Sequence, residues 1–222
     1  MSLVIDPFTL FGGLKELARD TSFYTATPNS STPSSDARSI GAASPTRRVF
    51  ALLAWWHGSN NRTLSSATIG GVTATIHIQT TDSVRARVAI IWADVPTGTT
   101  AVIACTFDGA VAFFAAAVIA LDGLKSGTPV DSDQSSIFVS VNIDTDLGGY
   151  VMAISQSSHA GTATSASWTF LTEGIEIDLN DGSNNFVVTM AYKANVADLT
   201  GQAIATNFAL STSGSIVCVS VL

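Results

Sequence analysis

The chain has 222 residues and a formal net charge of -7, and only 12% of its residues are charged, against about 25% in an ordinary soluble domain. Proteins that bind nucleic acid concentrate Lys and Arg to neutralise phosphates, so this charge argues against DNA or RNA as a partner. The length allows one large β-sandwich or two small domains. We expect a single domain preceded by an N-terminal arm.

Residues 1–24 are predicted to form this arm. Residues 13–20 carry Leu14 and Leu17 at helical spacing with charged residues between them, so a short helix or an irregular segment is expected there. The start of the chain lacks the basic and long apolar regions of a secretory signal, which favours assembly inside the host cytoplasm. The arm either binds a partner or is a disordered tail; its candidate partner-binding residues are Leu3, Val4, Ile5, Phe8, Leu10 and Phe11.

Residues 25–46 are rich in Ser, Thr, Ala and Pro. Such a composition cannot bury enough apolar surface to fold alone. We therefore expect a linker between the arm and the folded domain.

From residue 47 to residue 222 the pattern is that of short β-strands. Residues 49–56 are apolar at both odd and even positions, which predicts a central strand covered on both faces. The longest apolar run, residues 110–121, is too short to span a bilayer and reads as a second such strand. About a dozen strands recur every 8–12 residues or so, which is typical of an antiparallel, jelly-roll-like β-sandwich. We find no internal repeat at a fixed period in the sequence.

Three stretches resemble a β-sandwich module of tailed-phage structural proteins, including prophage and gene-transfer-agent relatives. They are Ala67-Thr-Ile-Gly-Gly-Val-Thr-Ala-Thr-Ile76, Val88-Ala-Ile-Ile-Trp-Ala-Asp-Val-Pro-Thr-Gly-Thr-Thr-Ala-Val-Ile103 and Ala117-Val-Ile-Ala-Leu-Asp-Gly-Leu124. The resemblance covers residues 47–124, a little over a third of the chain. It implies a role in particle architecture or host-surface contact, as in head-decoration, spike or tail-fibre proteins, and it assigns no catalytic residue.

No assembled catalytic or metal-binding signature is present in the sequence. The Gly-x-Ser-x-Gly elbow of hydrolases and the Cys/His spacings of zinc sites are both missing. His57, His77 and His159 are expected to be ordinary surface histidines. We therefore predict no enzyme activity and no cofactor.

Acidic residues could still bind Ca²⁺ or act as paired catalytic carboxylates. The segment with Glu173, Glu176 and Asp178 departs from the EF-hand order, so a solvated strand face is favoured over a metal site near Asp178. The pairs Asp131/Asp133 and Asp144/Asp146 have the residue type that glycosidases use, but we expect them only to solvate strand ends.

Carbohydrate binding is the main alternative function, because sugars stack on exposed aromatic rings. Trp168 follows a polar loop and is the best candidate for an exposed ring, whereas Trp92 is expected in the core. Trp55 and Trp56 must face opposite ways in one strand. Cys105 and Cys218 lie in apolar strands and are expected to be buried thiols rather than a disulfide.

The sequence thus predicts a non-enzymatic structural component of a phage-like particle. It would be located in the virion and would assemble with other virion proteins as a homo-oligomer, through sandwich surfaces and the arm. The alternative is a carbohydrate-binding adhesin or receptor-binding module that contacts a host-surface glycan through Trp168. Neither reading requires membrane insertion.

Overall fold

The computed structural model describes residues 13–58, 60–81, 86–136, 140–159, 166–180, 185–208 and 214–222. Within these ranges the chain forms eighteen β-strands and no helix, so no helix there is long and apolar enough to cross a membrane. The first ten strands are β1 (Lys15–Arg19), β2 (Tyr24–Ala26), β3 (Ser34–Ser39), β4 (Arg48–Trp56), β5 (Leu64–Ile69), β6 (Val72–Thr73), β7 (Thr75–Gln79), β8 (Ala86–Asp94), β9 (Thr100–Phe107) and β10 (Phe113–Asp122). The others are β11 (Asp131–Ser135), β12 (Ser140–Thr145), β13 (Tyr150–His159), β14 (Ala166–Trp168), β15 (Thr172–Asn180), β16 (Asn185–Ala194), β17 (Leu199–Phe208) and β18 (Ser215–Val221).

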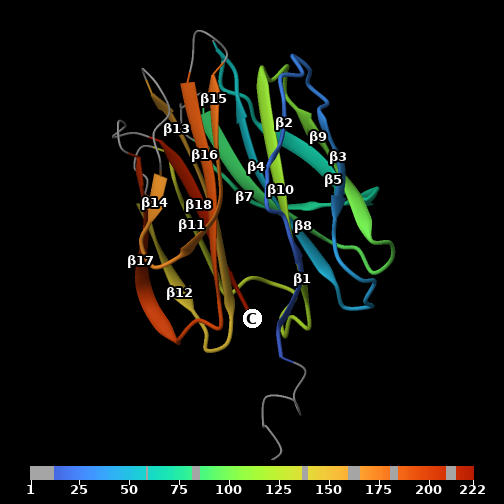
Figure 1. The fold of residues 1–222 in the computed structure, drawn as a ribbon, viewed down its shortest axis with the longest axis vertical. Helices are drawn as coiled ribbons and strands as arrows, with labels where there is room; N and C mark the ends of the chain where they lie inside the picture. The colour runs from blue at the N-terminus through green and yellow to red at the C-terminus, as the bar shows by residue number, and fades with distance from the viewer. Residues whose placement is uncertain are drawn as a thin grey trace, which may run out of the picture.

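The strands form four antiparallel sheets that stack as layers (Figure 1). Sheet I has the order β3-β9-β5-β6, and sheet II has the order β1-β10-β4-β8-β7 with β2 also paired to β10. Sheet III has the order β11-β18-β13-β16-β15, and sheet IV has the order β12-β17-β14. The predicted antiparallel all-β fold is confirmed, but the chain builds two stacked sandwiches instead of the single one that we expected.

Apolar cores fill the spaces between successive layers. In β4, Leu53 faces sheet I while its neighbour Leu52 faces sheet III. In β13, Met152 faces sheet II while Val151 faces sheet IV. Sheets II and III are therefore covered on both faces, and this is why their central strands are apolar at successive positions. The prediction that residues 49–56 and 110–121 contain central strands is confirmed.

The two halves of the chain repeat one topology. We call residues 13–122 unit 1 and residues 131–222 unit 2. Strands β1, β3, β4, β5, β7, β8, β9 and β10 of unit 1 correspond in order to β11, β12, β13, β14, β15, β16, β17 and β18 of unit 2. Every pairing among the first set recurs, antiparallel, among the second. The repeat lies in strand order and register and not in residue identity, so the sequence alone did not predict it.

Spacing and hydrogen bonds support the repeat. The starts of β4 and β13 lie 102 residues apart (150 − 48), as do those of β10 and β18 (215 − 113). In unit 1 the Arg47 N–H donates to the Ser44 carbonyl at 3.2 Å, and the Val95 N–H donates to the Arg47 carbonyl at 3.2 Å. In unit 2, Gly149 donates to Asp146 at 3.0 Å and Val196 to Gly149 at 3.2 Å. The turn before the central strand is thus built in the same way in both units.

The N-terminal segment differs from its prediction. The expected helix over residues 13–20 is wrong, because Lys15–Arg19 forms β1 against β10. Residues 25–46, expected as a linker, instead form part of β2 and all of β3, and Ile40 is fully buried. The candidate arm residues Leu3, Val4, Ile5, Phe8, Leu10 and Phe11 lie outside the described residues.

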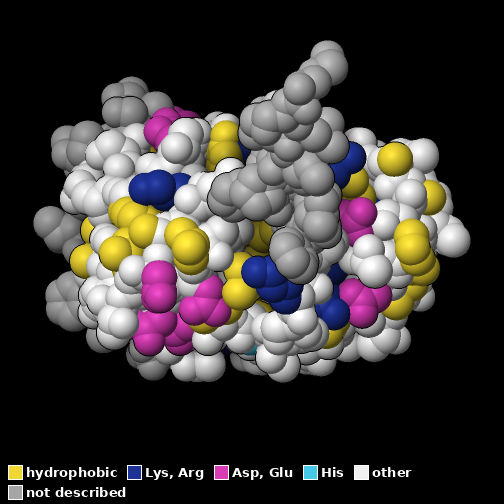
Figure 2. Space-filling model, turned by 90° about the horizontal axis from the view of Figure 1, so that it is seen from below, with side chains coloured by type: hydrophobic (Ala, Val, Ile, Leu, Met, Phe, Trp, Pro, Cys, Tyr) yellow, Lys and Arg dark blue, Asp and Glu magenta, His cyan; other side chains and the backbone are white. Residues whose placement is uncertain are grey.

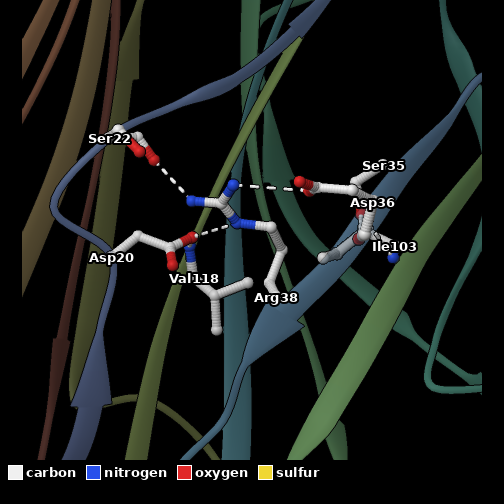
Figure 3. Close-up of polar contacts among 7 residues, drawn as sticks. All are labelled: Asp20, Ser22, Ser35, Asp36, Arg38, Ile103 and Val118. Carbon is white, nitrogen blue, oxygen red and sulfur yellow. Dashed lines mark hydrogen bonds and ion pairs between the residues drawn. The ribbon is translucent and has the colours of Figure 1, made fainter.

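An ion pair fixes this segment to the sandwich (Figure 3). The Arg38 Nε donates to Asp20 Oδ2 at 2.9 Å, and Arg38 Nη2 donates to the Ser22 carbonyl at 2.6 Å. The same Asp20 oxygen accepts the Val118 N–H of β10 at 2.8 Å. Burial raises the pKa of Asp20 above its usual value, although Arg38 pulls it down. The link between β1 and β2 is therefore held to both β3 and β10.

The arginines at and just before the start of β4 contact groups of the protein itself. Arg47 is fully buried, and its guanidinium donates to the carbonyls of six residues in two turns: Ile40, Gly41, Ala42, Val95, Thr97 and Gly98. Arg48 pairs with Asp94 at 2.8 Å and lies 3.7 Å from the ring centroid of Trp92. Arg87 is also buried and donates to oxygens of Arg62 and Thr63, while Arg85 lies outside the described residues.

Candidate functional site: a tryptophan and carboxylate seam

Trp168 and the acidic segment, which the sequence analysis considered separately, meet at the seam between β14 and β15. Trp168 is partly buried, and its Nε1–H donates to Thr189 Oγ1 at 2.9 Å. The Thr189 hydroxyl in turn donates to Glu173 Oε1 at 3.1 Å. One threonine of β16 thus connects the indole of β14 to a carboxylate of β15. We call Trp168, Glu173, Glu176, Thr189 and Thr206 the unit 2 seam.

Glu176 closes the outer side of this seam. One of its carboxylate oxygens accepts the Ala166 N–H at the edge of β14. Burial raises the pKa of Glu176, and the neighbouring carboxylates of Glu173 and Asp178 raise it further. Glu173, Glu176 and Asp178 are all exposed, so the seam offers acceptor oxygens to solvent beside an aromatic ring.

A buried hydroxyl without a partner lies on the inner side of the seam. Thr206 is opposite Trp168 in the β14–β17 pairing, so the two side chains share the inner face of sheet IV. Its side chain is fully buried, and Oγ1 has no hydrogen-bond partner in the structure. Such a group costs free energy unless something satisfies it.

The fold does not require this polar set, as unit 1 shows. Phe107 ends β9 and Phe208 ends β17, and the residue two positions before each of them is Cys105, paired with Ala67, in unit 1 and Thr206, paired with Trp168, in unit 2. Ala89 corresponds in the same way to Thr189, because Leu53 and Ser155, their partners in β4 and β13, lie 102 residues apart (155 − 53). The positions of Trp168, Thr189 and Thr206 therefore carry Ala, Ala and Cys in the unit that shares their topology.

The other acidic pairs support strand edges. Asp131 Oδ2 accepts the Asp144 N–H at 2.8 Å, and Asp133 Oδ2 accepts the Asn142 N–H at 3.0 Å. The Asp144 carboxylate accepts the Gly201 N–H at 2.7 Å. These carboxylates therefore accept hydrogen bonds from backbone N–H groups of β12 and β17. Among the described residues, no three His, Cys, Asp or Glu side chains gather to hold a metal ion.

The histidines and cysteines lie in separate elements. His57 follows β4 and accepts the Asn60 N–H at 3.2 Å; His77 belongs to β7, is half-buried, and has its pKa lowered by burial. His159 ends β13, and its side chain is not among those described. Cys105 and Cys218 are buried free thiols, as predicted.

The remaining aromatic candidates are committed to packing. Trp55 is fully buried between sheets I and II, and Trp56 faces sheet III, so their predicted opposite orientation is confirmed. Tyr150 is buried and donates to Glu16 Oε2 at 2.6 Å. Trp92 packs against the core between sheets II and III, as expected.

Sequence reasoning found Trp168, Glu173 and Glu176 but missed Thr189 and Thr206. Thr189 sits in the largely apolar strand β16 and Thr206 in the mixed strand β17, and by sequence alone both look like ordinary strand residues. Aligning the two units would have marked them, because the equivalent residues of unit 1 are Ala89 and Cys105.

Comparison with protein-family models, curated proteins and solved structures finds no match to this chain.

Proposed function

We propose that the protein is a non-enzymatic structural component of a phage-like particle, of the head-decoration, head–tail, or fibre and spike type. It would assemble in the virion with other virion proteins and with copies of itself, through its sheet surfaces and its N-terminal arm. The resemblance in residues 47–124 motivates this proposal, and the outer face of sheet I is the structural observation that supports it.

The outer face of sheet I exposes small and apolar side chains of β9 to solvent. Residues of β9 alternate between the core and solvent, so Thr100, Val102 and Thr106 are exposed while Ile103 is fully buried. Val102, in the middle of the sheet, is 40% exposed. Figure 2 shows hydrophobic side chains along the right-hand rim, the side on which Figure 1 places β3, β5 and β9. On β9 this face carries small uncharged side chains, which another subunit can cover at little desolvation cost.

The face is tested by placing a charge on it. We expect Val102→Lys to reduce incorporation into particles or oligomers, measured by sedimentation, because a lysine there would be buried against the partner. The matched control is Ala203→Lys, on the corresponding strand β17 of unit 2. Equal incorporation of wild type and both variants would contradict a role for sheet I.

The arm is tested by truncation. Deleting residues 1–12 removes the six apolar arm residues but leaves β1 in place. We expect the truncated protein to keep its fold and to lose incorporation, because burial of each large apolar side chain contributes about 1.5–3 kcal/mol. Unchanged sedimentation of the truncated protein would remove the arm from the proposal.

A second candidate function is carbohydrate binding at the unit 2 seam. The observation that favours it is the meeting of a partly exposed indole with two exposed carboxylates, since ligand sites combine an aromatic surface with a few convergent polar groups. A glycan array on the wild type and on Trp168→Ala tests it. An array without any signal for the wild type would leave the structural role as the only proposal.

A further inference from the structure

We propose that the unit 2 seam binds a saccharide that carries no anionic group, with an amino sugar preferred over a neutral sugar. This inference rests on the carbohydrate-binding candidate above and adds the class of ligand. Trp168 would stack against the sugar ring, and Glu173 and Glu176 would accept hydrogen bonds from its hydroxyl or ammonium groups.

The comparison of the two units locates the site. Both units have the same strands and pairings, yet only unit 2 replaces small apolar side chains at this place with Trp168, Thr189 and Thr206. Unit 1 fills the same layer with apolar groups and keeps its fold. The polar residues of unit 2 are therefore not required by this topology, although the Trp168 ring also packs against the core of unit 2.

The unpartnered hydroxyl points to a ligand. Thr206 Oγ1 is buried without any partner on the inner face that it shares with Trp168, and hydrogen bonds through Thr189 hold the indole to Glu173. A polar group that arrives beside the indole can satisfy this hydroxyl, which would recover the free energy lost by its burial. A purely apolar ligand offers no such group.

The shape and polarity of the seam select a sugar. A saccharide presents an apolar C–H face together with ring hydroxyls, and the seam offers an indole with carboxylate oxygens beside it. Ionised carboxylates accept hydrogen bonds and do not donate, so they suit hydroxyl and ammonium donors. Charge-assisted hydrogen bonds of this kind are stronger than neutral ones.

The charge of the seam selects against anionic sugars. Glu173, Glu176 and Asp178 lie close enough for the first and last to raise the pKa of the second. Lys193 of the neighbouring strand β16 lies over the Phe170 ring, and Arg19 lies over the ring of Tyr192. These carboxylates would repel a carboxylate or sulfate on a ligand bound beside them, whereas they would attract an ammonium group.

The test uses the full chain and isothermal titration with three probes of equal length: a chitosan tetrasaccharide, a neutral cello-oligosaccharide and an oligogalacturonate. We expect affinity to fall in that order, with the anionic probe unbound. Glu173→Gln should weaken the amino sugar roughly tenfold or more while changing the neutral sugar less, because only the ammonium needs the charge. Thr206→Val should weaken both sugars, because it keeps the side-chain shape and removes the hydroxyl.

The control variant is Thr106→Val, an exposed threonine of unit 1, which should bind as the wild type does. Circular dichroism of each variant separates loss of binding from loss of fold. Equal affinity of Glu173→Gln for all three probes, or tight binding of the oligogalacturonate, would overturn the proposed ligand class. Sugar binding that none of the seam variants changes would overturn the site while leaving carbohydrate binding intact, and no binding of any sugar would remove both.

Discussion

Arg47 joins two turns of unit 1 through backbone oxygens. Its guanidinium donates to six carbonyls and is fully buried. In unit 2 the same position is Gly149, and the nearby turns are joined instead by the Thr145 hydroxyl, which donates to the Ala197 carbonyl at 2.6 Å. The turns beside the central strand are thus joined by one guanidinium in unit 1 and by one hydroxyl in unit 2.

We expect Arg47→Met to lower the free energy of unfolding by about 3–5 kcal/mol, because six carbonyls lose a buried donor. Urea denaturation measures the change. Lys125→Met removes the same charge from an exposed position and should change stability by less than about 0.5 kcal/mol. Similar losses in both variants would mean that charge, and not the carbonyl contacts, matters.

The two thiols provide a second prediction at the residue scale. Burial raises the pKa of Cys105 to about 12 and moves that of Cys218 upward as well. Because the thiolate is the reactive form, neither should react with iodoacetamide at pH 8 in the native protein. Without reductant, both should be alkylated after unfolding, as mass spectrometry would show. A single rapid adduct, or none in denaturant, would contradict this arrangement.

The N-terminal strands show at the element scale how an ion pair holds a sheet edge. Arg38→Met would leave the Asp20 carboxylate buried without its cation. We expect faster amide exchange in residues 15–26 than in the wild type, with unit 2 unchanged. Asp36→Asn, which removes only a 3.3 Å exposed contact with Arg38, is the control.

The same variant has a pH dependence with a definite sign. Burial already raises the pKa of Asp20, and loss of Arg38 raises it further. When the pKa of a carboxyl is higher in the folded protein than in the unfolded one, stability is retained at a pH below the unfolded-state pKa. It is lost as the pH rises through the folded-state pKa. The free energy of unfolding that Arg38→Met loses relative to the wild type, measured by urea denaturation, should therefore be larger at pH 7 than at pH 4. A loss of stability that grows on acidification would show that the buried Asp20 carboxylate is not its cause.

The elements that sequence could predict are those whose pattern reflects burial. Residues 48–56 and 113–122 are apolar on both faces because sheets cover both sides. Leu14 and Leu17 suggested a helix, but the edge of β10 offers backbone partners that a local pattern cannot reveal. The seam was found only in part for the same reason: Trp168 stands out locally, while Thr189 and Thr206 acquire meaning from strand register.

The whole molecule consists of two units joined face to face. The core between sheets II and III takes residues from both, and the Ser215 hydroxyl of unit 2 donates to the Ala86 carbonyl of unit 1 at 2.8 Å. Residues 125–128, which connect the two units, are exposed, so the connection is accessible to a protease.

We therefore expect the units to stay together after the connection is cut. With a protease site inserted between Gly127 and Thr128, the cleaved protein should elute at the mass of the intact chain in native gel filtration and separate only in denaturant. Met152→Lys, which places a charge in the fully buried interface, should release the units once the chain is cut. Separation of the unmodified cleaved protein would show that the core between the units is too weak to hold them.

The inner sheets also have a consequence for synthesis on the ribosome. The face of sheet II that packs against sheet III is complete when residue 122 has emerged, but its cover is encoded by the following hundred or so residues. At typical elongation rates of roughly 5–20 residues per second, this apolar surface stays exposed to solvent for about 5–20 s. Nascent chains on neighbouring ribosomes could meet through it, so a chaperone that shields newly made polypeptides would raise the yield of correctly paired molecules.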